Sequence, residues 1–121
     1  MAMVDLRQLI NKIQEQKQAN VNLTLEFECT VETDDFKPLV KVINYFMNFC
    51  EPIAEGLTVE VSLNAAVDYY NLSFIAPTSK TEVPEVNEQV VEILKDYDAE
   101  FSVLFKPGKF YQATIQFNLG E

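Results

Sequence analysis

The sequence predicts an α+β domain, a two-layer sandwich in which helices cover one face of a mixed sheet of about five strands, with a further helix at the N-terminus. The spacing of apolar residues switches along the chain between the helical repeat of three to four and the strand repeat of two. The order is helix, strand, helix, strand, strand, helix, strand, strand, and the later strands come in pairs joined by short turns. Hairpins with helices gathered on one face are typical of such a sandwich.

Residues 3–18 predict an amphipathic helix. Apolar residues on one stripe follow at alternating spacings of three and four: Met3, Leu6, Ile10 and Ile13. This stripe either packs on its own domain or forms a homodimer seam with the same helix of a second copy. In the second case Leu6, Ile10 and Ile13 contact the partner. A hinge at Ala19 and Asn20 would separate this N-terminal helix (1–20) from the main domain (21–121).

The middle of the chain predicts a long strand and then a buried helix. Strict alternation of apolar and polar residues from Val21 to Glu32 indicates one half-buried strand. Apolar residues at helical spacing from about Phe36 to Ala54 indicate the central helix, and two aspartates directly before it are candidate caps. Pro52 predicts a kink or an early end, and Gly56 is a stop signal.

The remainder predicts two hairpins separated by a helix. Residues 57–63 and 69–75 alternate as strands joined by a short loop. A polar link leads to a helix over about 86–96, whose first turn is acidic. The chain closes with a hairpin over 101–117 that turns at 106–109.

The charge of the chain argues against several kinds of partner. Nine basic and nineteen acidic residues give a net charge of -10, which repels nucleic acid backbones and anionic lipid surfaces. No apolar run approaches the roughly 20 residues that a membrane-spanning helix needs. The first residues lack a basic region followed by an apolar stretch, so we expect no secretory signal and a cytoplasmic location.

The types of residue present exclude several chemistries. The sequence contains no histidine and two cysteines, Cys29 and Cys50, too few ligands for the usual zinc or iron sites. A Ser-His-Asp triad, a Cys-His pair and a phosphohistidine are excluded for the same reason. Both cysteines fall on the apolar phase of their segments, so we expect buried free thiols.

Three stretches, in order, resemble the ATP-binding domain of the GHKL superfamily, in its histidine-kinase branch. Residues 43–50, Ile-Asn-Tyr-Phe-Met-Asn-Phe-Cys, resemble the N box, an Asn-Leu-Leu-x-Asn-Ala run whose second asparagine meets magnesium. Asn48 stands at that second asparagine and Asn44 at the first. Residues 86–97 resemble the helix that follows the family's glycine-rich lid, and 99–119 resemble its closing hairpin.

The departures from the family pattern fall on the nucleotide contacts. The family's aspartate that accepts the adenine amino group is Ala76 here, and the glycine two residues later is Thr78, with Pro77 stiffening the turn. The chain passes from Thr78 to Val86 without a glycine, whereas the family's lid wraps phosphates with glycine amides. The resemblance therefore implies a pseudo-ATPase with no cofactor and no catalytic residue.

The polar side of the central helix offers little for a metal. Glu51 stands where many of these kinases carry lysine, and with Glu55 near Asn48 it would attract a cation. Two carboxylates on an exposed helix face are usually only solvated, so we expect no metal site. Asn44 and Asn48 are expected to make polar contacts to nearby strand or loop groups rather than to bind magnesium.

Two functions remain open. The first is a non-catalytic interaction or regulatory module in bacterial signalling, similar to the non-ATP-binding domain of bacterial histidine phosphotransferases. A protein partner would contact the N-terminal helix and the shortened lid region; the candidates there are Pro77, Thr78, Lys80 and Pro84. The alternative is a sensor of a small apolar or cationic ligand, in which aromatic residues refill the nucleotide cleft. The candidates are Tyr69, Tyr70, Phe74 and Phe110.

Overall fold

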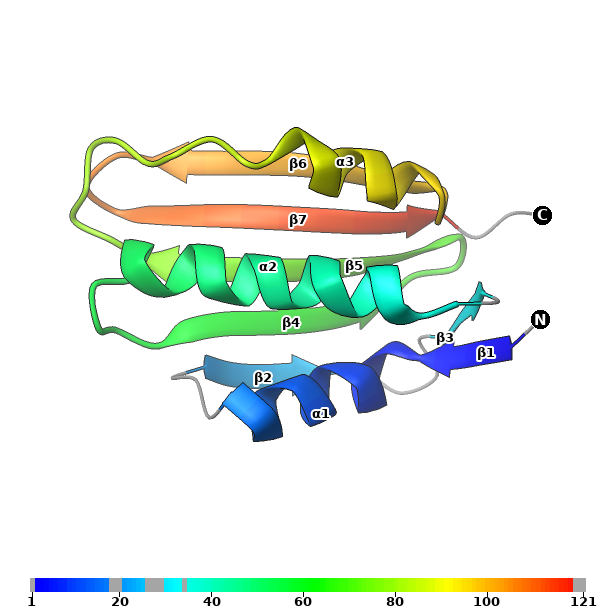
Figure 1. The fold of residues 1–121 in the computed structure, drawn as a ribbon. Helices are drawn as coiled ribbons and strands as arrows, with labels where there is room; N and C mark the ends of the chain where they lie inside the picture. The colour runs from blue at the N-terminus through cyan, green and yellow to red at the C-terminus, as the bar shows by residue number, and fades with distance from the viewer. Residues whose placement is uncertain (1, 18–20, 26–29, 34, 119–121) are drawn as a thin grey trace.

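The computed structural model describes residues 2–17, 21–25, 30–33 and 35–118 as two packed layers, one of helices and one of strands (Figure 1). The elements in chain order are β1 (Ala2–Asp5), α1 (Leu6–Lys17), β2 (Val21–Leu25), β3 (Thr30–Thr33), α2 (Lys37–Ile53), β4 (Val59–Ala65), β5 (Tyr69–Pro77), α3 (Glu88–Lys95), β6 (Ala99–Lys106) and β7 (Phe110–Asn118).

The main sheet has five strands in the order β2-β4-β5-β7-β6. β2 runs parallel to β4, and the other neighbours are antiparallel. All three helices lie on the same face of this sheet, with α2 in front of β5 and α3 in front of β6 (Figure 1). The predicted α+β sandwich with a mixed five-stranded sheet is confirmed.

The N-terminal third differs from its prediction in two ways. Residues 2–5 form strand β1, so the first helix begins at Leu6 rather than at residue 3. The single long strand predicted over 21–32 is divided: β2 joins the main sheet, while β3 pairs with β1 in a separate two-stranded sheet. Alternation of apolar residues fits both strands equally, because it reports one buried face and not the identity of the strand partner. Residues 26–29, including Cys29, and the predicted hinge at residues 19 and 20 lie outside the described part of the chain.

Helix α2 forms close to its predicted bounds, with different signals at its ends. The N-cap residue is Phe36, whose side chain makes no capping hydrogen bond, while Asp35 Oδ1 accepts the backbone N–H of Lys37 at 3.0 Å. The helix ends at Ile53, one residue after Pro52, in agreement with the predicted early end. Glu55 and Gly56 then turn the chain with positive φ angles of 53° and 88°.

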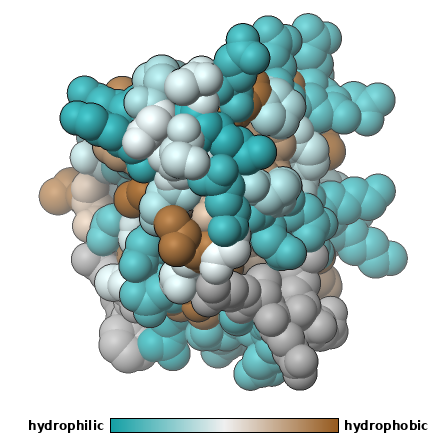
Figure 2. Space-filling model, turned by 90° about the vertical axis from the view of Figure 1, so that its left-hand side faces the viewer, coloured by the Kyte–Doolittle hydropathy of each residue, from teal (hydrophilic) through white to brown (hydrophobic). Residues whose placement is uncertain are grey.

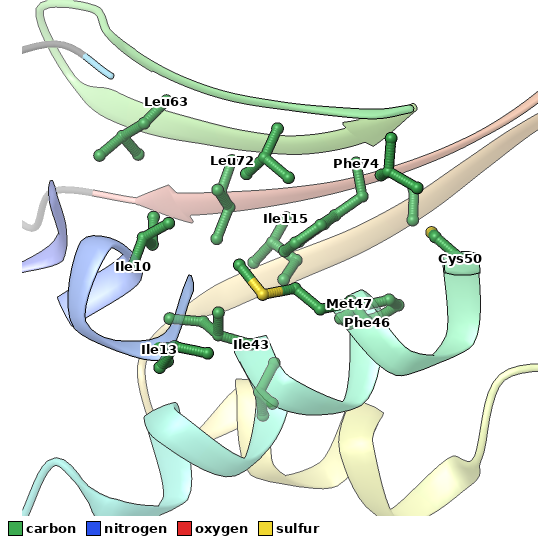
Figure 3. Packing of buried hydrophobic residues seen from close by; sticks show 14 of the residues in the cluster. Ile10, Ile13, Ile43, Phe46, Met47, Cys50, Leu63, Leu72, Phe74 and Ile115 are labelled. Carbon is green, nitrogen blue, oxygen red and sulfur yellow. The ribbon is translucent and has the colours of Figure 1, made fainter. Parts of the chain in front are cut away.

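The core lies between the helices and the inward-facing residues of β4, β5 and β7 (Figure 3). Phe46 of α2 stacks on Phe74 of β5 with ring centroids 5.5 Å apart. Cys50 is a buried free thiol, as predicted, and burial raises its pKa to about 12. The thiol is therefore neutral and unreactive at physiological pH.

Helix α1 belongs to the same core. Leu6, Ile10 and Ile13 have exposed fractions of 0, 0 and 5% and belong to one apolar cluster with Ile43 and Leu72 (Figure 3). These three side chains are therefore covered by the chain's own domain, and the expectation that they contact a partner is corrected. The stripe predicted an apolar contact surface, but one amphipathic face has the same spacing whether it packs within a chain or between chains. No helix in the described residues is long and apolar enough to cross a membrane.

Candidate functional site

The region to which the family resemblance points is the space between α2 and α3, together with the end of β5 and the segment 78–87. Asn48 is exposed on α2 and Asn44 is half-buried, both away from the buried stripe of the helix, as their spacing predicts. The side-chain amides of these two asparagines are the polar groups of α2 in the stretch that resembles the N box.

Tyr45 ties α2 to the start of α3. Its hydroxyl oxygen accepts the backbone N–H of Asn87 at 2.9 Å, and the Asn87 side chain in turn caps α3 by accepting the N–H of Gln89 at 2.8 Å. This link crosses the side of α2 that faces α3. Because Asn87 is the N-cap of α3, this bond fixes the start of α3 against α2.

Aromatic side chains fill the layer between α2 and the strands under α3. Phe46 lies 5.2 Å from Phe101 of β6, and Phe49 lies 5.6 Å from Tyr111 of β7, measured between ring centroids. Tyr111 is buried, and that burial raises the pKa of its hydroxyl to about 12. Tyr111 is therefore a neutral packing residue at neutral pH and no general base.

The end of β5 carries Ala76 and is followed by Thr78, the residues that the resemblance places at the family's adenine contacts. Ala76 is 0% exposed and pairs with Tyr111 across the sheet. Thr78 is 4% exposed; its N–H donates to the Lys109 carbonyl at 3.0 Å and its hydroxyl oxygen accepts the N–H of Lys80 at 3.1 Å. The N–H of Gly108 donates to the Lys80 carbonyl at 2.8 Å, so two backbone bonds fasten this segment to the turn between β6 and β7.

The burial of Thr78 corrects its selection as a partner contact. Its side chain stabilises the local turn and has almost no surface to offer. Of the other residues selected in this region, Lys80 and Pro84 are exposed and Pro77 is half-buried. A threonine in a polar link suggests an exposed residue, but the sequence does not reveal the hydrogen bonds that bury this one.

Glu55 has a structural role that the sequence did not predict. Its carboxylate accepts the backbone N–H of Ser79 at 2.9 Å, and the Ser79 hydroxyl lies 3.0 and 2.8 Å from its two oxygens. These bonds lower the pKa of the Glu55 carboxyl group, and the bond from the Ser79 N–H has the largest effect. Glu55 itself has a positive φ of 53°, which is uncommon for a residue other than glycine.

The engagement of Glu55 with Ser79 bears on the cation site considered for Glu51 and Glu55. The Glu55 oxygens are directed to the segment after β5 rather than to a shared point with Glu51. Among the described residues, no group of three or more histidine, cysteine, aspartate and glutamate side chains could hold a metal ion. The end of the molecule that contains this link presents mostly hydrophilic residues with small, separate apolar areas (Figure 2).

The four aromatic residues considered for a small-ligand pocket do not form one lining. Phe74 is fully buried against Phe46, and Tyr70 packs beside the same core. Tyr69 and Phe110 alternate to the opposite face of the sheet and lie at opposite ends of the β5–β7 pair. Aromatic residues on neighbouring strands share a site only where the strand register places them on one face. The sequence alone did not determine that register.

The structure contains an apolar groove that the sequence did not predict. It has a volume of about 450 Å³ and lies between the segment before α3, α3 itself and β6. Its lining residues are Val83, Pro84, Glu85, Val86, Glu88, Val91, Phe101, Val103, Phe105 and Tyr111. A second hollow of about 480 Å³ continues it along α3 and β6 and shares Val91 and Phe101 with it. We call the two together the β6 groove.

Comparison with known proteins identifies the fold. No protein-family model and no curated protein matches the sequence. The mycobacterial sensor histidine kinase MprB aligns over 97% of this chain and 97% of its own, with a TM-score of 0.80 and 11% identity. The histidine kinase AdeS of Acinetobacter baumannii aligns over 99% of this chain and 68% of its own, with a TM-score of 0.78 and 12% identity.

A third similar structure is the histidine kinase domain of the E. coli osmosensor EnvZ, which aligns over 100% of this chain and 90% of its own, with a TM-score of 0.78 and 9% identity. At such identities the comparison establishes the fold and leaves activity open. The resemblance seen in the sequence is thereby confirmed at the level of the fold. The described helices and strands of this chain adopt the fold of histidine kinase catalytic domains.

Proposed function

We propose that this chain is a non-catalytic module of a bacterial signalling system, built on the histidine kinase ATPase fold, which does not bind ATP and acts through contact with a protein. The observation that carries the proposal is Ala76. It is fully buried at the position where the resembling family places its adenine-binding aspartate, and its side chain has no hydrogen-bond acceptor. An adenine amino group placed there would lose its bonds to water without replacement.

The surroundings of Ala76 support the same proposal. Thr78 is fastened to Lys109, and Tyr45 joins α2 to the residue before α3, so both sides of this region are tied by bonds within the chain. The segment 79–87 contains no glycine to wrap phosphates. Of the N box, Asn44 and Asn48 are retained, and Asn48 is the one that stands at the magnesium position; a single amide is a weak holder of a magnesium-triphosphate group.

Two features support a protein partner: the absence of histidine from the sequence and the exposed residues of the segment after β5. The sequence has no histidine that could carry a phosphoryl group. In a phosphotransfer system similar to the bacterial histidine phosphotransferases, it would therefore serve as a docking or regulatory subunit. Lys80 and Pro84 are exposed on the segment that replaces the lid and stay candidates for that contact.

The proposal is tested by recording backbone amide NMR spectra while Mg-ATP is added. We expect no saturable shifts at the amides of Asn44, Asn48, Ala76 and Thr78. Saturable shifts concentrated at those amides would show that the cleft still accepts a nucleotide and would overturn the proposal. Magnesium chloride without nucleotide is the control for effects of the cation and of ionic strength.

A further inference from the structure

Strand β6 is an unprotected edge of the main sheet. In the described part of the chain it pairs with β7 alone, over the unbroken register from Ala99 to Lys106. Between described residues, the backbone hydrogen bonds outside helices and strands include none from residues 100–105. Alternate N–H and C=O groups of the strand are therefore directed away from the sheet, where another strand can pair with them.

The composition of β6 makes this edge unusual. The five residues from Phe101 to Phe105 contain no charge and no proline, and the register contains no bulge. Edge strands of monomeric proteins commonly carry a charge, a proline or a bulge, because each of these prevents pairing with the strands of other chains. Val103 and Leu104 are 45 and 49% exposed, although both are large and apolar. The edge therefore has the properties of a strand that is covered by a partner.

The β6 groove lies beside this edge on the helix side of the sheet. Phe101, Val103 and Phe105 form its floor, and Val83 and Val86 form part of its wall. A strand added to β6 would direct every second side chain into the groove, because alternate residues of a strand point to one face. Backbone pairing would supply part of the affinity, and the groove would select apolar side chains at those alternate positions.

The charge around the groove indicates which charged residues the incoming strand would carry. Glu85, Glu88 and Glu100 line it, all exposed, and the lining lysine, Lys95, already forms an ion pair with Glu92 at 3.2 Å. The uncompensated charge at the rim is therefore negative, in a chain with a net charge of -10. Lysine or arginine at the ends of the incoming strand would be attracted, and acidic residues would be repelled.

We propose that β6 and its groove form a docking site for an extended segment of a partner protein, with apolar side chains at alternate positions and basic residues at its ends. A second copy of this chain fits less well, since pairing of two β6 strands would bring two acidic rims together. This inference deepens the proposed function, because it names the surface and the chemistry of the partner segment, and it rests on that function.

The test is fluorescence anisotropy with a labelled peptide of alternating valine and threonine that carries a lysine at each end. We expect saturable binding with a dissociation constant on the order of tens of micromolar. Two control peptides should bind at least about tenfold more weakly: one with glutamate in place of the lysines, and one with proline in place of the central threonine.

The matched protein variants are Val103→Lys and Leu104→Lys. Both wild-type residues are about equally exposed, but Val103 lines the groove and Leu104 lies on the opposite face of the same strand. V103K should weaken the peptide at least about tenfold, because it places a charge both on the pairing edge and in the groove. L104K places the same charge on the edge but on the opposite face, so its effect should be several-fold smaller. Thermal unfolding of both variants checks that each is folded.

The double variant Glu85→Lys, Glu88→Lys tests the rim without a change in the strand. It should weaken the lysine peptide and strengthen the glutamate peptide, each by several-fold. Absence of saturable binding to the wild-type chain, or equal losses with V103K and L104K, would overturn the proposal. So would a wild-type dimer in sedimentation that V103K dissociates, because the occupant would then be a second copy. None of these results depends on Mg-ATP, so failure of the peptide site is distinguishable from failure of the proposed loss of nucleotide binding.

Discussion

At Ala76, adenine binding and folding favour different side chains: a carboxylate for the base and an apolar group for the buried position. A carboxylate at this position would serve an adenine base, but the site is fully closed to solvent and pairs with Tyr111. A charge placed there would lose its hydration without gaining a partner. The present alanine satisfies the packing of the core at this buried position.

The variant Ala76→Asp tests this opposition. Because it buries a carboxylate without a partner, we expect it to lower the free energy of unfolding by more than about 3 kcal/mol in urea denaturation. Ala76→Ser, which adds a small uncharged group, should cost about 1–3 kcal/mol. Restored stability of A76D in the presence of Mg-ATP would contradict the account, because it would mean that the cleft can still accept adenine.

Glu55 predicts a dependence of stability on pH. Its pKa is lowered in the folded state by the N–H and hydroxyl of Ser79. The carboxylate bonds therefore stabilise the fold above the pKa of the unfolded chain, near 4.3, and are lost as the pH falls through the lower folded value. Glu55→Gln should be less stable than wild type at pH 7, with a small difference because the site is exposed.

The measurement is the melting temperature of wild type and E55Q by circular dichroism between pH 3 and pH 7. The difference between the two should narrow as the pH falls below about 4. Glu51→Gln, which makes the same change of charge one turn earlier in α2, controls for the altered net charge. A difference between wild type and E55Q that is constant over this range would count against the proposed role of the Glu55–Ser79 bonds.

At the scale of elements, the sequence predicted which segments are helices or strands better than it predicted which strands pair with one another. The spacing of Leu39, Ile43 and Phe46 was enough to place α2, because a buried helix repeats a local pattern. Alternation over 21–32 was not enough to show that β2 and β3 enter different sheets. That outcome depends on β1 and β4, which lie far away in sequence. Strand pairing is a long-range property with no local signal.

Helix α1 illustrates the same limit and provides a test. Ile10 is buried in the common core, whereas the adjacent Asn11 is exposed. Ile10→Ala should lower the free energy of unfolding by about 2–5 kcal/mol, since it removes buried apolar volume. Asn11→Ala should change it by no more than about 0.5 kcal/mol. Similar small effects of both variants in urea denaturation would mean that α1 does not pack on the domain.

At the scale of the whole molecule, the histidine kinase fold is combined with a proposed change at the nucleotide site. The expected departures at Ala76 and Thr78 come from the resemblance, whose motif has fixed positions. The link between Glu55 and Ser79 could not, because the two residues meet only when the turn after α2 lies against the end of β5. The β6 groove escaped prediction for a similar reason, as it needs β6 to be the last strand of the sheet.

The proposed loss of nucleotide contacts is compatible with the fold. The core that joins α1, α2 and the sheet is stable without reference to a nucleotide, since its residues pack on one another. The same scaffold can therefore retain its strands and helices while its surface takes another function. In this chain the exposed edge of β6 and its acidic rim are the features that such a function would use.

The central claim, that this domain does not bind ATP, is tested most directly by isothermal titration calorimetry with Mg-ATP. The account predicts no saturable heat up to nucleotide concentrations of about 1 mM, where a weak site would already be half occupied at a free energy of about -4 kcal/mol. One-site binding with a micromolar dissociation constant would contradict it.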